Sequence, residues 1–153
     1  MSIKRTLLYV LIAVAGISGS AYGQIITTIA GDGVAGHTGN GGAATSAQII
    51  APVCVAPSRK FEVVIGDNAS SVRRVSTHGI INTIAGIPDS IGFSGDNGPA
   101  TAAKMLSPFG VTYDLTGNLF IADKANNRIR RVDTSGVITT VAGCTVCLGS
   151  EGV

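Results

Sequence analysis

The sequence predicts an all-β fold: a partial β-propeller with about two four-stranded antiparallel blades plus one leading strand, after an N-terminal signal helix. Three observations support this prediction. A stretch of about 56 residues occurs twice in the 153-residue chain, and long internal repeats are typical of propellers and solenoids. Within the stretch, short strand-like segments alternate with turn residues. The first 23 residues follow the pattern of a secretory leader.

The leader begins with Lys4 and Arg5, continues with the apolar run Thr6–Ile17 and ends in the small residues of Ala21-Tyr22-Gly23. This order is that of a cleavable signal peptide. The run is shorter than the roughly 20 apolar residues of a membrane-spanning helix, so we expect no stable membrane span. The expected location is secreted or extracytoplasmic: periplasm, cell surface or extracellular. An uncleaved N-terminal anchor is the alternative.

Net charge argues against a nucleic-acid partner. The chain has 11 Lys and Arg and 9 Asp and Glu, and removal of Lys4 and Arg5 leaves 9 of each. A balanced chain lacks the positive potential that attracts phosphate backbones or anionic membranes. We therefore expect no nucleic-acid partner.

Two kinds of motif reveal the repeat. Ile26–Gly31, Ile81–Gly86 and Ile138–Gly143 share a β-branched pattern ending in Ala-Gly, at spacings of 55 (26 to 81) and 57 (81 to 138) residues. Gly36–Ala56 aligns with Gly92–Thr112, with identity at 8 of 21 positions. The expected domains are a signal peptide (1–23), a first, degenerate repeat (24–79), a second repeat (80–136) and the start of a third, truncated repeat (137–153).

The second copy predicts its strands in order. Residues 109–114 alternate in polarity, and Leu115–Asn118 form a turn in which a glycine supplies positive φ. Residues 119–122 are apolar on both faces, as in a strand between two layers. Residues 128–133 and 137–142 complete a four-stranded meander, the unit of a propeller blade. The Gly-rich stretch 86–108 links blades, and its segment Pro99–Leu106 could form one short helical turn with Pro99 at the first helical position. Met105 and Leu106 packed against the blade would anchor this long connection.

Three cysteines are present, Cys54, Cys144 and Cys147. The Cys144–Cys147 pair could form a local disulfide, and unpaired thiols are the alternative. A redox pair is disfavoured because no helical pattern follows it, and a zinc site because no second pair of ligands matches. We expect no cofactor.

Several motifs of the second copy resemble the NHL-repeat family, particularly the long-loop variety of secreted bacterial proteins, which is similar to the propeller of teneurins. They are Ser107–Val111, Gly117–Asp123, Asn127–Arg130, Val141–Gly143 and the loop Gly92–Thr101. The resemblance implies a propeller used mostly as a binding or interaction platform. It also implies structural roles for Gly117, Asn118, Asp123, Asn127 and Arg128, with Asp123 and Arg128 tying strand ends together.

The first copy departs from this pattern at residues 57–61 and 70–72, which leaves its hairpin turn and any Asp–Arg pair open. Two arginine clusters, Arg73-Arg74 and Arg128 with Arg130-Arg131, occupy corresponding strands. We interpret them as solvated strand edges, where charge deters edge-to-edge aggregation. RNA binding, which the resemblance raises for a basic face, is the alternative.

No catalytic or metal-binding constellation stands out in the sequence. His37 and His78 are interpreted as exposed or packing residues, and Asp32, Asp96 and Asn97 as turn residues without calcium-loop spacing. We expect a secreted, non-catalytic NHL-repeat propeller module that binds an unknown protein or carbohydrate ligand. The alternative is a fragment of an extracellular propeller enzyme of lyase or lactonase type, whose active site lies in missing blades.

Two blades alone would leave two sheet faces uncovered, whereas repeat units bury their apolar faces against neighbours. We therefore expect either a fragment of a longer protein with further blades or self-association that closes the propeller.

Overall fold

The structure, a computed structural model, describes residues 25–58, 60–68 and 70–143. The first sheet has the order β1 (Pro52–Pro57), β2 (Val63–Asp67), β3 (Ser71–Val75) and β4 (Ile81–Ala85). The second has the order β5 (Gly98–Pro99), β9 (Val137–Ala142), β8 (Arg128–Val132), β7 (Leu119–Asp123) and β6 (Pro108–Tyr113). Three single 3-10 turns accompany them, η1 (Ala44–Ser46), η2 (Ala100–Ala102) and η3 (Lys124–Asn126).

The predicted all-β meander is confirmed. Strands β6 to β9 lie within one residue of the predicted bounds, and every consecutive pair is antiparallel. The short strand β5 was not expected. It pairs with the start of β9, and its counterpart in the first sheet is a single bridge between Ala43 and Ile80.

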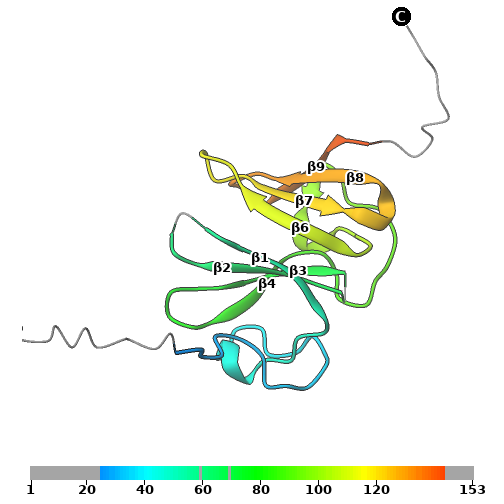
Figure 1. Cartoon of the computed structure of the whole chain (residues 1–153). Coiled ribbons are helices and arrows are strands. Elements are labelled where there is room, and N and C mark those ends of the chain that lie inside the picture. Colours follow the sequence, from blue (N-terminus) through cyan, green and yellow to red (C-terminus); the bar gives the residue numbers. More distant parts are fainter. Residues whose placement is uncertain (1–24, 59, 69, 144–153) are drawn as a thin grey trace, which may run out of the picture.

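The two sheets pack face to face as adjacent blades, which confirms the partial propeller. Strands β1 and β2 of the first sheet contact β6 of the second, and Figure 1 shows the twisted sheets stacked, with the first linker loop beyond the first sheet. The buried core between them contains Val64, Val72, Ala85, Ala100, Ala103, Met105, Leu119, Ile121, Val132 and Ile138. Both sheets and the second linker therefore share one apolar core.

The copies correspond position by position in space. The spacing is 55 residues at Gly31 and Gly86, 56 residues from Gly36 and Gly92 to Asp67 and Asp123, and 57 residues from Ser70 and Asn127 onward. The 3-10 turns η1 and η2 occupy the same place in the two linkers. Pro99 caps η2 in an extended conformation instead of taking its first helical position. The expected anchoring of the second linker by Met105 is confirmed, because Met105 is fully buried.

The leading strand is not formed. Residues 25–30 have no regular secondary structure. The segment nevertheless lies against the first linker as β4 lies against the second linker, because Gly31 N donates to Ala44 O just as Gly86 N donates to Ala100 O. A strand exists only when a neighbour completes its hydrogen-bond ladder. Within the described ranges, no strand lies beside residues 25–30.

Each sheet extends past an expected repeat boundary. The last strand of the first sheet, β4, begins after residue 79, and the corresponding strand of the second sheet, β9, begins after residue 136. The predicted signal helix and the Cys144–Cys147 pair lie outside the described residues. In the part of the chain that is described, no helix is long and apolar enough to span a bilayer.

Candidate functional site

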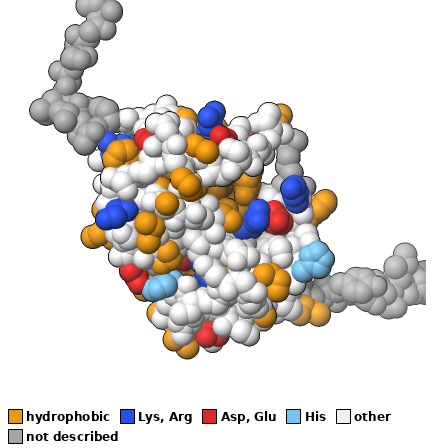
Figure 2. Space-filling view, turned by 180° about the vertical axis from the view of Figure 1, so that it is seen from behind, with side chains coloured by type: hydrophobic (Ala, Val, Ile, Leu, Met, Phe, Trp, Pro, Cys, Tyr) orange, Lys and Arg blue, Asp and Glu red, His pale blue; other side chains and the backbone are white. Residues whose placement is uncertain are grey.

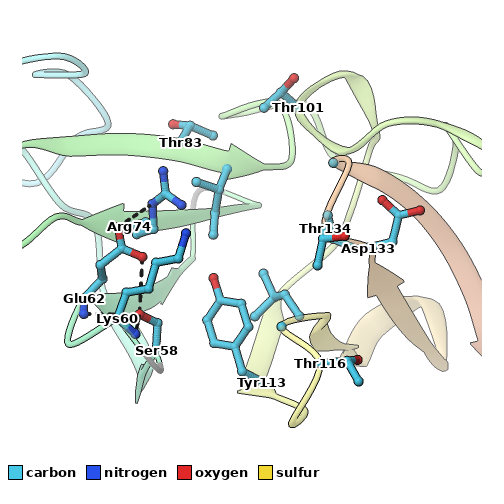
Figure 3. Close-up of a pocket in the computed structure, with 15 residues that line it drawn as sticks. Ser58, Lys60, Glu62, Arg74, Thr83, Thr101, Tyr113, Thr116, Asp133 and Thr134 are labelled. Atoms are coloured by element: carbon cyan, nitrogen blue, oxygen red, sulfur yellow. Dashed lines mark hydrogen bonds and ion pairs between the residues drawn. The ribbon is translucent and has the colours of Figure 1, made fainter.

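A pocket of about 480 Å³ opens between the two sheets, at the end where the β1–β2 and β6–β7 hairpins lie. Both blades contribute to it (Figure 3). Its lining consists of Ser58, Lys60, Glu62, Arg74, Thr83, Ile84, Thr101, Tyr113, Thr116, Gly117, Leu119, Val132, Asp133, Thr134 and Gly136. The site is thus a property of the blade pair, and neither blade forms it alone.

The wall from the first blade carries charged groups. Arg74 Nε lies 3.6 Å from Glu62 Oε1, and Ser58 Oγ donates to Glu62 Oε2 at 3.2 Å. Figure 3 shows these contacts as dashed lines, with Lys60 extending beside them. Glu62 is therefore held between a hydroxyl and a guanidinium, while the exposed Lys60 adds a second cation to the rim.

Tyr113, the last residue of β6, stands between the two walls with its hydroxyl directed into the pocket (Figure 3). Burial raises the pKa of the Tyr113 phenol, Arg74 opposes the rise and Glu62 adds to it. The hydroxyl is therefore protonated at neutral pH and can both donate and accept a hydrogen bond. The buried Leu119 and Val132 make the floor apolar.

The wall from the second blade is built by two turns. Asp133 accepts hydrogen bonds from Ser135 Oγ at 2.6 Å and Val137 N at 3.0 Å, and these bonds hold the pKa of its carboxyl below the usual value. The Asp133 carboxylate therefore accepts these hydrogen bonds from residues of its own turn. Thr116 and Thr134 add hydroxyls to the rim.

The hairpin of the first copy, left open by the sequence, is formed with a different chemistry. Ser58 Oγ accepts from the backbone N of Lys60 (3.1 Å) and Glu62 (3.2 Å), as a carboxylate oxygen of Asp114 does in the second copy. Phe61 takes positive φ and is 91% exposed. A serine thus replaces an aspartate without loss of the turn.

Two of the predicted structural residues lie in the second hairpin. Gly117 has φ of +94°, in the left-handed region that favours glycine. Asn118 Nδ2 donates to Asp114 Oδ2 at 2.7 Å. Both residues therefore shape the turn that borders the pocket.

The other three lie at the β7–β8 connection, away from the pocket lining. Asp123 is fully buried and accepts from Leu106 N at 2.8 Å. Asn127 takes left-handed φ of 54°. Arg128 pairs in register with Asp123, stacks 3.6 Å from the Phe93 ring centre and donates to Asn126 O. The arginine that lies 3.4 Å from the Asp123 carboxylate is Arg130.

The interpretation of the arginine clusters as solvated edges is wrong for Arg73 and Arg130, both of which are fully buried, and for Arg128, which is only 8% exposed. The Arg73 guanidinium donates to Gln48 O (2.7 Å), Thr38 O (2.9 Å) and Asn40 Oδ1 (3.0 Å). A buried cation is tolerated when its donors find partners. Arg73 therefore clamps the first linker onto its sheet.

Arg130 repeats the clamp on the second linker at corresponding positions. It lies 3.4 Å from Lys104 O, 3.1 Å from Ser94 O and 2.8 Å from Asp96 Oδ1. Asp96 is thus the counterpart of Asn40, and its charge pairs with a buried guanidinium. On the face shown in Figure 2, basic and acidic side chains lie interspersed among apolar ones, with no basic patch over that face.

The remaining candidates lie apart from one another. His37 Nδ1 lies 3.0 Å from Asp89 Oδ2, His78 is exposed in a turn, and Asp32 accepts from Val34 N. Asn97 takes positive φ in the second linker. Among the described residues, no three His, Cys, Asp or Glu side chains gather as potential metal ligands.

The sequence did not predict the pocket residues Lys60, Glu62 and Tyr113. Their counterparts in the other copy are Thr116, Asn118 and Pro57, so each position breaks the repeat. Repeat positions with a shared structural role keep similar chemistry, as Arg73 and Arg130 do. A departure from the repeat at a hairpin was therefore the signal that could have revealed the site.

Comparisons with known proteins agree with the repeat and the fold. Residues 87–150 match the family model described as the teneurin NHL domain, which confirms the NHL resemblance for this part of the chain. Mouse teneurin-1 is 37% identical over 70 residues, 40% of this chain and 3% of teneurin-1. Mouse teneurin-4 is 43% identical over 49 residues, 32% of this chain and 2% of teneurin-4. The chain thus spans only a few per cent of the length of these relatives.

One solved structure shares the fold over most of the chain. It is a putative phosphatase from Bacteroides thetaiotaomicron, with a TM-score of 0.50 and 18% identity, covering 72% of this chain and 26% of the other. At this identity the likeness shows the fold alone.

Proposed function

We propose that this NHL-type propeller module is exported and acts without catalysis, holding a carbohydrate ligand in the pocket between its two blades. The observation that carries the proposal is the composition of that pocket. An aromatic ring, Tyr113, stands over an apolar floor, and hydroxyl and charged groups surround it. A sugar ring has the matching character, with apolar C–H faces and a periphery of hydroxyl groups.

The size of the pocket favours a small polar molecule as the ligand, in preference to the flat surface of another protein. The volume of about 480 Å³ lies within the range of ordinary small-molecule sites, roughly 300–1,000 Å³. Glu62 can accept hydrogen bonds from hydroxyls, and Lys60 and Arg74 can donate to them. Specificity for a protein ligand would favour a broader, flatter patch.

Binding to a printed array of neutral and acidic oligosaccharides, followed by calorimetry with the strongest one, tests the proposal. We expect Lys60→Ala and Tyr113→Phe each to weaken binding by about 5- to 30-fold, as loss of one or two hydrogen bonds would. Phe61→Ala on the same hairpin lies outside the pocket lining and is the matched control. Absence of sugar binding, or binding that both pocket variants leave unchanged, would overturn the proposal.

The same samples address the enzymatic alternative. Mass spectrometry of the bound oligosaccharide after long incubation should return its original mass. A product lighter by a sugar unit, or carrying a new double bond, would instead identify a hydrolase or lyase.

Export rests on the leader pattern of residues 1–23. We expect the chain recovered from outside the cytoplasm to begin at Gln24. Recovery of chains that still begin at residue 1, firmly attached to membranes, would favour the uncleaved anchor.

A further inference from the structure

The charged groups on the first-blade wall of the pocket are not balanced. This wall carries two cations, Lys60 and Arg74, and one carboxylate, Glu62. The Glu62 side chain is only 15% exposed, and both of its oxygens have partners, the Ser58 hydroxyl and the Arg74 guanidinium. The wall therefore has one positive charge in excess, and its carboxylate is already held by neighbouring side chains.

The two cations keep hydrogen-bond donors for a ligand. The Arg74 side chain is 42% exposed, and its approach to Glu62, between Nε and Oε1, measures 3.6 Å, which is beyond hydrogen-bond distance. Within residues 25–58, 60–68 and 70–143, neither the Arg74 guanidinium nor the Lys60 ammonium donates a hydrogen bond. Both groups can therefore donate to a molecule that enters the pocket.

The carboxylate of the opposite wall does not compensate these cations. Asp133 Oδ1 accepts hydrogen bonds from Ser135 N at 2.9 Å and from Ser135 Oγ at 2.6 Å, within its own turn. Figure 3 shows the Asp133 carboxylate pointing away from the wall of the first blade. An anionic group in the pocket would thus meet Lys60 and Arg74 without facing this carboxylate.

Tyr113 adds a third donor beside the two cations. Figure 3 shows its hydroxyl directed toward Arg74 and the end of Lys60. A guanidinium, an ammonium and a phenol hydroxyl together suit a carboxylate, which only accepts hydrogen bonds. The Tyr113 ring and the buried floor residues Leu119 and Val132 remain available for an apolar sugar face.

We infer that the sugar held in this pocket is acidic, and that Lys60 and Arg74 bind its carboxylate. The inference rests on the proposed function and names the class of carbohydrate, an oligosaccharide that contains a uronic acid or another sugar acid. A hydrogen bond to a charged group is about twice as strong as a neutral one, so the acidic group contributes a large part of the affinity. Because both cations are accessible to solvent, salt screens this attraction.

Calorimetry with trisaccharides of galacturonic and glucuronic acid, each compared with its methyl ester, tests the inference. The ester keeps the sugar rings and their hydroxyls but removes the negative charge. We expect the better-bound acid to bind about 5- to 20-fold more tightly than its ester at low salt. This ratio should shrink as the ionic strength rises.

Three variants assign the preference to the pocket. Lys60→Gln should weaken binding of the acid by about 3- to 10-fold and that of the ester by less. Glu62→Gln removes the carboxylate that would repel an acidic ligand, and it should strengthen binding of the acid by about 2- to 5-fold. A misfolded variant could not produce this gain. Lys104→Gln is the matched control, since it removes a positive charge from an exposed residue outside the lining and should leave both affinities unchanged.

The outcomes separate this inference from the proposed function. Equal affinity for acid and ester, or an acid preference that Lys60→Gln and Glu62→Gln leave unaltered, would overturn the acidic ligand while sugar binding itself stands. Tighter binding of a sulfated trisaccharide of the same charge would overturn the assignment of a carboxylate. Absence of binding to every sugar, neutral or acidic, would overturn both claims.

Discussion

The Arg130 guanidinium lies 3.4 Å from the Asp123 carboxylate, and neither side chain is exposed to solvent. Asp123 also accepts a hydrogen bond from Leu106 N, while Arg130 holds Ser94 O and Asp96 in the second linker. One buried ion pair thus joins two strands of a blade to the loop that precedes it. Because burial removes water as an alternative partner, each member depends on the other.

Substitution of Arg130 should therefore be costly. Arg130→Met leaves Asp123 charged, buried and without its cation, and we expect the free energy of unfolding to fall by about 3–5 kcal/mol. Arg131→Met, at the neighbouring and partly exposed position, is the control and should cost about 1 kcal/mol or less. Urea denaturation measures both. Equal costs for the two variants would contradict the clamp.

Gly86 should tolerate no side chain. Its φ is +84°, and an added Cβ would collide with the backbone of Ser70 and with Met105. We expect Gly86→Ala to lower the free energy of unfolding by about 2–4 kcal/mol, the sum of backbone strain and overpacking. Gly79 also has positive φ, +73°, but has open space around it, so Gly79→Ala should cost only about 1 kcal/mol. Thermal unfolding of the pair separates steric collision from strain. A Gly86→Ala variant as stable as Gly79→Ala would refute the close approach.

Acid should weaken the β6–β7 hairpin through Asp114. The hydrogen bond from the Asn118 side chain, with others from Asn118 N and Thr116, holds the pKa of Asp114 well below its usual 3.8. Such a group stabilises the fold above its unfolded pKa, and this contribution is lost as pH falls below about 3.8 toward the folded value. Asp114→Asn removes the titrating group, so its urea midpoint should change less between about pH 6 and pH 3 than that of the wild type. An identical change in both proteins would contradict this linkage.

The three cysteines should differ in reactivity. Burial raises the pKa of the Cys54 thiol, which lowers its thiolate fraction, and the thiolate is the form that reacts. We expect Cys54 to alkylate slowly in the folded protein and rapidly in denaturant. If Cys144 and Cys147 form the predicted disulfide, denatured protein takes up a single label without reductant and three labels with it. Mass spectrometry counts the labels, and three labels without reductant would exclude the disulfide.

The repeat made most of the fold predictable, because two copies report the same strands. Alternation at Phe109–Asp114 and the turn at Gly117 are local signals, and they placed β6 and β7 within one residue. The prediction of a leading strand was wrong for a non-local reason. Residues 26–31 carry the strand pattern, but pairing depends on a neighbour that periodicity cannot supply.

Burial of charge was the other feature that local pattern could not predict. Arg130 shares a strand face with Val132, but arginine is rarely buried unless paired, so the sequence alone favoured a solvated side chain. Its partners, Ser94 O and Asp96, lie in a linker distant in sequence. The pocket at Tyr113 was hidden for the same reason, since its walls come from turns of two different blades.

The packing of the two sheets as adjacent blades is the claim on which the pocket depends. Methyl NOE spectroscopy of the labelled full chain measures it most directly. Val64 and Val72 of the first sheet share a buried core with Leu119 and Ile121 of the second, so strong cross-peaks should connect their methyl groups. Cross-peaks confined within each sheet, with none between these two pairs, would contradict the account.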